Sequence, residues 1–198
     1  MSFELEDREQ REPLKGPEAL LLIAMPQLQD PNFKRTVALL VDQDENGTFG
    51  LVLNRPVELS ARNLCEKLEV EWRGDPSACA HWGGPVQPDT GWVLCAEGLG
   101  VDLDDEAVKE VVPGLFFAGS LEVLRAVAVT PPPDVRLFLG YAGWGPGQLE
   151  AEMAQGAWLV APVSSEVVFS ASPESMWDHV LRSLGVDPAT LISTRGVH

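Results

Sequence analysis

Short apolar runs, separated by glycine, proline and polar residues, make up most of the chain from Glu18 onward. Runs of this length bounded by turn residues are typical of β-strands. Several are apolar at successive positions, which predicts a sheet covered on both faces. The predicted strands are Leu20–Ala24, Thr36–Val41, Gly50–Leu53, Ala80–Trp82, Gly91–Cys95, Leu115–Phe117, Val135–Leu139 and Trp158–Ala161.

Helices are fewer, and the clearest one begins at Ser172. Ser172 is a favourable N-cap, Pro173 suits the first helical position, and Glu174 would lie near the positive end of the helix dipole. Gly185 is a favourable C-terminal stop. The apolar stripe of this helix should consist of Met176, Trp177, Val180, Leu181 and Leu184.

Three further segments carry helix signals. Ser60 is placed to cap a helix that runs to Leu68, because its hydroxyl can accept from a free amide of the first turn. The segments Ser120–Ala128 and Gln148–Gln155 each follow a glycine-containing turn. Strands together with these helices predict an α+β fold.

Length and composition predict a single domain. The chain has 198 residues, of which 45% are hydrophobic, so it can bury a core without disulfides or a structural metal. We expect this domain to cover residues 18–198, after an acidic, mobile N-terminal tail at residues 1–17. The longest apolar run, Leu20–Met25, is far shorter than the roughly 20 residues that span a bilayer. We therefore expect a cytoplasmic protein that does not associate with membranes.

The formal net charge is −16, from 30 acidic and 14 basic residues. Such a charge repels polyanions, and Lys34 and Arg35 are the only adjacent basic residues, so direct binding to nucleic acid is not expected. The cysteines, Cys65, Cys79 and Cys95, are too few for a disulfide framework. We expect reduced thiols.

The segment Gly140–Gly147 contains four glycines between a predicted strand and a predicted helix. Such a turn can hold a phosphate at a helix N-terminus. Here the dinucleotide spacing Gly-x-Gly-x-x-Gly is not met, and Trp144 and Pro146 add bulk where a phosphate would approach. Glu150 and Glu152 would also repel an anion. The favoured interpretation is a tight turn that positions Trp144.

Cys79 and His81 share one face of a predicted strand, and Cys95 lies on another strand that could be its neighbour. Together they are a conceivable three-ligand metal site, or a cysteine nucleophile with a histidine base. No Cys-x-x-Cys pair supports a metal, and lone cysteines are commonly buried. Core thiols and a packed histidine are favoured, and we expect neither a metal nor a cofactor.

Arg35 and the pair Asn54–Arg55 lie at the ends of two predicted strands. Two guanidinium groups and an amide could hold the carboxylate or phosphate of a small ligand. Salt bridges to the chain's surplus of acidic residues are the favoured alternative.

Four groups of longer motifs stand in a fixed order along the chain. They are Leu22–Pro26 with Leu28–Phe33 and Arg35–Val37, then Gly47–Pro56, then Gly83–Val86, and finally Gly140–Trp144 with Gly147–Glu152 and Trp158–Leu159. Taken together, these motifs resemble the YqgE/AlgH family of bacterial proteins. The similarity covers about residues 18–168, and Trp177 and Gly185 fit the family's last helix.

The resemblance implies a compact α+β domain in which helices flank a strongly bent mixed sheet. It implies no established activity, although members are often described as transcriptional regulators and one is linked to control of alginate synthesis. The chain departs from the common pattern at Thr90 and Cys95, where an arginine and a histidine are usual, and at Gly156, near a usual asparagine.

Our leading hypothesis is a non-enzymatic binding or regulatory protein that acts through an unknown protein partner or a small ligand. Any link to transcription would then run through partners rather than DNA. The alternative is an enzyme acting on a small anionic metabolite near Arg35, Asn54, Arg55 and Trp144. No residue is assigned a catalytic role, and the candidate binding residues are Arg35, Asn54, Arg55, Gly83, Gly84, Tyr141, Trp144 and Gln148.

The net charge predicts that the purified protein does not bind duplex DNA specifically near physiological salt. A gel-shift titration at nanomolar protein with competitor DNA measures this. A shifted band that resists the competitor would contradict the prediction.

Overall fold

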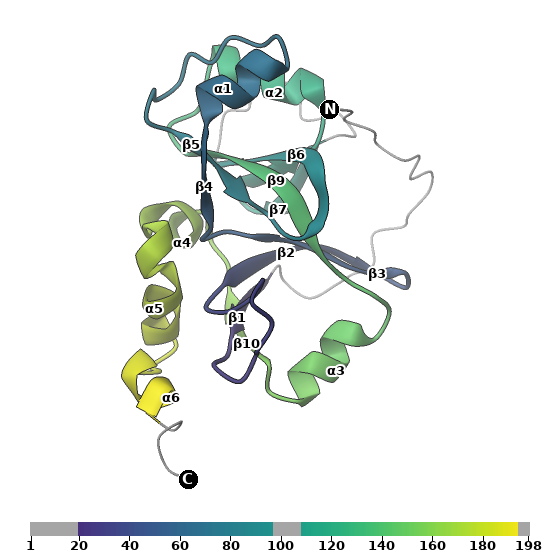
Figure 1. Ribbon diagram of the computed structural model, residues 1–198, viewed down its shortest axis with the longest axis vertical. Coiled ribbons are helices and arrows are strands. Elements are labelled where there is room, and N and C mark those ends of the chain that lie inside the picture. The colour runs from purple at the N-terminus through teal and green to yellow at the C-terminus, as the bar shows by residue number, and fades with distance from the viewer. Residues whose placement is uncertain (1–19, 97–107, 194–198) are drawn as a thin grey trace.

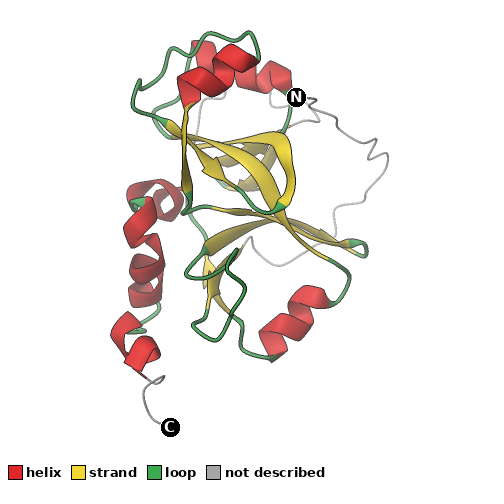
Figure 2. Ribbon diagram, viewed as in Figure 1, coloured by secondary structure: helices red, strands yellow, loops and turns green. Residues whose placement is uncertain are grey.

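A computed structural model describes residues 20–96 and 108–193, so the predicted tail at residues 1–17 lies outside the described residues. Within them, ten strands form one curled sheet flanked by helices, which confirms the α+β class (Figure 2). The strands are β1 Leu20–Ala24, β2 Val37–Asp44, β3 Gly47–Val52, β4 Pro56–Ser60, β5 Cys79–Trp82, β6 Val86–Ala96, β7 Val108–Val112, β8 Leu115–Ala118, β9 Val135–Trp144 and β10 Trp158–Pro162. The helices are α1 Ala61–Lys67, α2 Leu121–Val129, α3 Gln148–Ala154, α4 Ser165–Ser170, α5 Pro173–Ser183 and α6 Pro188–Ser193.

The strand order is β10-β1-β2-β3-β9-β6-β8-β7, with β5 paired to β9 and β4 paired to β5. The β5–β9 pair is parallel and the other described pairs are antiparallel, so the sheet is mixed. Helices α1 and α2 lie together at one end of the molecule, α3 lies toward the opposite end, and α4, α5 and α6 follow one another along one side (Figure 1). No helix of the described part is long and apolar enough to cross a bilayer.

Strand β9 joins the parts of the sheet. Its first half pairs with β5 on one side and β6 on the other, and its second half pairs with β3. The backbone at Gly83 links the two neighbours, because its N–H donates to the Leu139 carbonyl (2.8 Å) and its carbonyl accepts from the Val52 N–H (2.8 Å). Side chains at Gly83 or Gly84 would overlap the backbone of Gly140 or Tyr141. Glycine is therefore required where these segments cross.

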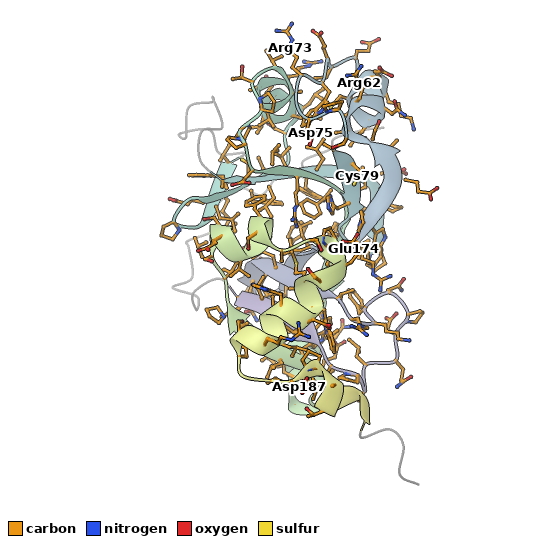
Figure 3. All side chains as sticks on the ribbon, turned by 90° about the vertical axis from the view of Figure 1, so that its left-hand side faces the viewer. Arg62, Arg73, Asp75, Cys79, Glu174 and Asp187 are labelled. Atoms are coloured by element: carbon orange, nitrogen blue, oxygen red, sulfur yellow. The ribbon has the colours of Figure 1, made fainter. Side chains whose placement is uncertain are left out.

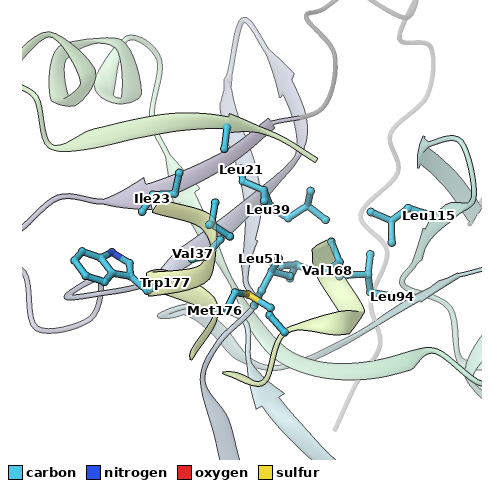
Figure 4. Close-up of a cluster of buried hydrophobic side chains, with 14 of the residues drawn as sticks. Leu21, Ile23, Val37, Leu39, Leu51, Leu94, Leu115, Val168, Met176 and Trp177 are labelled. Atoms are coloured by element: carbon cyan, nitrogen blue, oxygen red, sulfur yellow. The ribbon is translucent and has the colours of Figure 1, made fainter. Parts of the chain in front are cut away.

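The core has three parts. The largest lies between the sheet and helices α4 and α5, where Leu39, Leu51 and Leu94 meet Met176 and Trp177 (Figure 4). A second lies under α1 and α2, and a third surrounds Trp144 and Trp158 near α3. Apolar residues on both faces of the central strands therefore reflect cover on both sides, as the sequence predicts.

The predicted helix starts are found in the structure, although Ser172, the N-cap of α5, makes no capping hydrogen bond with its side chain. The Ser60 and Ser120 hydroxyls accept from first-turn amides of α1 and α2 at 3.1 Å. In α5 the side chains of the predicted stripe are buried up to Leu181, and Leu184 is partly buried. The Trp177 indole N–H donates to the Ala24 carbonyl (2.8 Å), which ties α5 to β1.

The structure differs from the sequence-based expectation in several places, among them the longer strands β2, β3 and β6. The sequence predicts a strand from Val135 to Leu139, but β9 continues to Trp144. Gly140, with a φ of 68°, bends the strand, and pairing with β3 continues after the bend. The elements β4, β7, α4 and α6 were not expected. They are short, and α4 contains Val-Val-Phe, a sequence with strand rather than helix propensity.

Gly140 and Gly147 give a matched test of the strand crossing. Both have a left-handed backbone, with φ of 68° and 73°, but an added Cβ at Gly140 would lie 2.5 Å from the Gly84 carbonyl oxygen, whereas at Gly147 it would meet nothing within 4 Å. Gly147→Ala should cost about 1–2 kcal/mol of unfolding free energy. Gly140→Ala should cost roughly 1–3 kcal/mol more, because backbone cannot move aside as a side chain can. Urea unfolding measures both, and equal losses would contradict the crossing.

Candidate functional site

A cavity of about 300 Å³ lies between the β2–β3 hairpin and the end of β9. Its floor is aromatic, because Phe49 pairs across the sheet with Gly143, and the Tyr141 ring stacks on Phe49 with centroids 4.7 Å apart. Gly143 has no side chain to fill the space, and an added Cβ would lie 3.3 Å from the Tyr141 ring. The lining residues are Asp42, Asp44, Asn46, Gly47, Thr48, Phe49, Val86, Tyr141, Gly143, Trp144 and Gly145.

The hairpin supplies the polar wall of this cavity. Asp42 and Asp44 alternate along β2, so the strand period places both carboxylates on one face. Asp44 accepts from the Asn46 N–H (2.8 Å), which shapes the hairpin turn. Lys109 on β7 places its ammonium 3.0 Å from Asp42. The cavity therefore combines carboxylates with aromatic faces, and a lysine of the chain already approaches its edge.

Tyr141 is held by a cluster of partly buried aromatic rings. Phe49 contacts Trp92 and Phe117 with ring centroids 5.1 Å and 5.6 Å apart, and Trp92 lies edge-on to Tyr141 at 6.2 Å. These rings come from β3, β6, β8 and β9. The position of Tyr141 thus depends on packing across four strands.

Trp144 lies on the opposite face of β9, and its side chain is a core residue with 4% exposure. It contacts Phe33 and Trp158, with ring centroids 6.0 Å and 5.8 Å away. The indole N–H groups of Trp144 and Trp158 both donate to Glu152 Oε2, at 3.1 Å and 2.7 Å. Gln148 donates to Glu152 Oε1 (2.9 Å) and accepts from the Gly145 N–H (3.0 Å). The turn after β9 is thereby fastened to α3.

The structure places Arg35, Asn54 and Arg55 in contacts within the protein. Arg35 pairs with Asp178 (2.9 Å) and lies 4.6 Å from the Trp177 ring centroid. The Asn54 side chain accepts from the Val37 N–H (2.9 Å) and donates to the Arg35 carbonyl (3.0 Å). Arg55 donates to backbone carbonyls of the 31–34 turn. For Arg35 this contact is the salt bridge that the sequence analysis favoured. All three side chains stabilise the ends of strands through contacts within the protein.

Cys79 and Cys95 do not lie on adjacent strands, so the conceivable three-ligand arrangement of the sequence analysis is not formed. Strand β9 separates β5 from β6, and Cys95 packs among the residues under α1 and α2. His81 packs on Phe138, which belongs to the core on the other face. No group of three His, Cys, Asp or Glu side chains arranged for a metal is present among residues 20–96 and 108–193.

The structure therefore brings together only part of the predicted set. Tyr141 and Trp144 line the cavity, and Gly83 and Gly84 lie behind it at the strand crossing. Sequence reasoning missed other lining residues: Asp42, Asp44, Phe49 and Gly143. The signal for Asp42 and Asp44 is the alternation of acidic residues at the end of an apolar run, a pattern that equally describes a solvated hairpin, whereas Phe49 and Gly143 lie in quoted motifs without being assigned to a site.

Comparison with known proteins agrees with this fold and confirms the family that the motifs indicated. The sequence profile of the AlgH-like family matches residues 21–189. The chain belongs to the AlgH-like family. A family relative from Myxococcus xanthus, a UPF0301 protein, is 42% identical over 180 residues, covering 90% of this chain and 96% of the relative. Another, from Chlorobaculum tepidum, is 46% identical over 168 residues, with 83% and 85% covered.

Two solved structures extend the comparison to the fold. The solution structure of the AlgH protein from Pseudomonas aeruginosa has a TM-score of 0.72 and 36% identity, and the match covers 96% of this chain and 99% of that one. The crystal structure of protein DIP2367 from Corynebacterium diphtheriae has a TM-score of 0.69 and 25% identity, with 92% of each chain covered. The bent mixed sheet with flanking helices is thus the fold of the family.

Glu152 is predicted to stabilise the turn that bounds the cavity. Glu152→Ala should cost roughly 2–4 kcal/mol of unfolding free energy, because it leaves two largely buried indole N–H groups without their acceptor. Gln148→Ala removes two exposed hydrogen bonds, to the same carboxylate and from the Gly145 N–H, and should cost less than Glu152→Ala, about 1 kcal/mol, because water can replace both. Urea unfolding checks both values. Equal effects would show that the indole bonds do not hold the turn.

Proposed function

We propose that the protein is a non-enzymatic binding or regulatory module that recognises a cationic group in the cavity between the β2–β3 hairpin and β9. The group is the side chain of a lysine or arginine on a partner protein, or a small amine. The observation that carries the proposal is the meeting of two carboxylates, from Asp42 and Asp44, with the aromatic floor of Phe49 and Tyr141.

The chemistry of the cavity favours a cation in two ways. Carboxylates attract it directly, and aromatic faces attract it through the negative potential above the ring. The net charge of −16 adds a long-range field that draws basic partners toward the protein. The contact between Lys109 and Asp42 supports the same preference, because the chain itself places an ammonium group there.

Binding rather than catalysis is supported by the residues of the cavity wall. No histidine, cysteine or serine is among its described lining residues, so the cavity has no pair of a hydroxyl or thiol nucleophile with a histidine base. The arginines proposed for an anionic metabolite, Arg35 and Arg55, already hold Asp178 and backbone carbonyls. These contacts favour structural roles for both.

We also propose that the protein acts in the cytoplasm and that any role in transcription runs through protein partners. The free thiols of Cys65, Cys79 and Cys95 suit a reducing compartment. The net negative charge supports an indirect role, because it opposes direct contact with DNA.

Binding is tested with lysine methyl ester, arginine methyl ester and spermidine as cationic probes, and with acetyl-glutamate as an anionic control. Calorimetry and thermal shift should detect the cations but not the anion, because a ligand that binds only the folded state raises its stability. Asp42→Asn should raise the Kd about tenfold, or about 1.4 kcal/mol. Lys109→Met removes the competing ammonium and should lower the Kd.

The opposite signs of these two variants make the test specific. Both variants lose the Lys109–Asp42 salt bridge. If that bridge affected binding only through the stability of the fold, the Kd of both variants would change in the same direction. Glu58→Gln on β4 changes an exposed acid outside the cavity and should leave the Kd unchanged. Binding of the anion, or equal responses of the three variants, would contradict the proposal.

A further inference from the structure

A second polar cluster lies on the sheet face covered by α4 and α5, away from the cavity. The parallel register of Ala80 with Leu137 places Cys79 beside Arg136 on one face. His81 follows on the same face, two residues along β5, and its ring lies 5.4 Å from Phe138. Cys79, His81 and Arg136 thus form one group on adjacent strands.

Two polar atoms of this group are buried and lack hydrogen-bond partners among the described residues. They are Nδ1 of His81, a side chain with 6% exposure, and Nη1 of Arg136. The other terminal nitrogen of Arg136 donates to the Ala171 carbonyl (3.3 Å), and its guanidinium lies 5.6 Å from the Phe169 ring centroid. Because buried polar groups are normally hydrogen-bonded, the two free atoms indicate a place that can hold a further oxygen.

Arg136 is the positively charged neighbour of Cys79 in this group. Burial lowers the pKa of Arg136, yet a guanidinium remains protonated in proteins, and Asp134 and Cys79 both attract its charge. Burial, and then the charge of Arg136, lower the pKa of His81 to about 4, so its ring is neutral near pH 7. Hydrogen bonding with the backbone of Leu137 and Cys79, and then the charge of Glu174, act on this pKa in the opposite direction. Arg136, rather than His81, is therefore the cation beside Cys79 on this face.

The other two cysteines provide an internal comparison. Cys65 and Cys95 are fully buried, and burial raises the pKa of their thiols to about 11 and about 12. Cys79 is only partly buried and lies on the side of the molecule that faces the viewer in Figure 3. Thiolate character and access together determine cysteine reactivity.

We propose that Cys79 is an oxidation site whose thiolate reacts with hydroperoxides to give a sulfenate held by Arg136 and His81. The inference concerns a different site from the cavity and does not depend on the proposed function. If the cavity does not bind cations, the proposal for Cys79 still stands. If Cys79 is not oxidised, the proposal for the cavity still stands.

The reaction is balanced with the hydroperoxide as the only oxidant. The Cys79 sulfur attacks one peroxide oxygen, an S–O bond forms, and the O–O bond breaks. Sulfur loses two electrons, and the peroxide is reduced to hydroxide or an alkoxide, which takes the proton of the new S–OH group and leaves as water or an alcohol. The new oxygen carries the negative charge and can accept from Nη1 of Arg136, the nitrogen without a partner.

The first experiment compares the three thiols within the folded wild-type protein. Alkylation by iodoacetamide at pH 7.4, followed by peptide mass spectrometry, should modify Cys79 at least about tenfold faster than Cys65 and Cys95. After brief treatment with hydrogen peroxide, dimedone should label Cys79 and neither of the others. Comparable rates at all three thiols, or no dimedone adduct at Cys79, would overturn the proposal without any variant.

The second experiment tests the role of the guanidinium. Arg136→Gln should slow both alkylation and sulfenate formation at Cys79 at least about threefold, whereas Arg136→Lys keeps the charge and should leave alkylation within about twofold of wild type. Arg73→Gln is the control, because Arg73 pairs with Glu71 and lies far from Cys79 in Figure 3. An unchanged rate in a folded Arg136→Gln protein would overturn the assignment of Arg136.

Discussion

The close crossing of two backbones, Gly83–Gly84 over Gly140–Tyr141, is the contact on which the rest of the structure depends. It lets the β5–β6 connection pass between β3 and β9, so that β9 can pair with β5 and β6 in its first half and with β3 in its second. A side chain on either segment would separate them. The curl of the sheet and the position of Tyr141 both follow from this contact.

The two faces of β9 between Tyr141 and Trp144 have different roles. One face carries Trp144, whose indole donates a hydrogen bond to Glu152 and packs against Phe33. Trp144 therefore holds α3 against the sheet. The other face carries Tyr141 and the bare backbone of Gly143, which leave the cavity open beside the acidic hairpin. A rigid, buried support behind an exposed polar surface is an arrangement suited to recognition, because little ordering remains to be done when a partner binds.

The sequence predicts those parts of the fold in which local and long-range forces agree. The boundaries of β1 follow from an apolar run between polar segments, and the starts of α1 and α5 follow from Ser60 and from Ser172–Pro173. The family also follows from sequence, because its motifs are long and ordered. The continuation of β9 could not be predicted, since Gly140 marks a bend that is indistinguishable in sequence from a turn.

The site was less predictable than the fold because it depends on contacts between distant segments. Arg35 meets Asp178, which lies 143 residues further along the chain, and no local pattern indicates this pair. Asp42 and Asp44 gain their significance only when β9 brings Tyr141 beside them. Aromatic and glycine positions in the Gly140–Gly147 segment were identified, but the acidic half of the cavity comes from the hairpin.

The crossing positions the acidic, aromatic cavity for which we propose a cationic ligand. The most direct measurement is a titration of the ¹⁵N-labelled protein with arginine methyl ester, followed by NMR. Saturable amide shifts should be confined to residues 42–49, Val86 and residues 141–145, which include the cavity wall. Shifts concentrated at Arg35, Asn54 and Arg55, or an equal response to acetyl-glutamate, would contradict it.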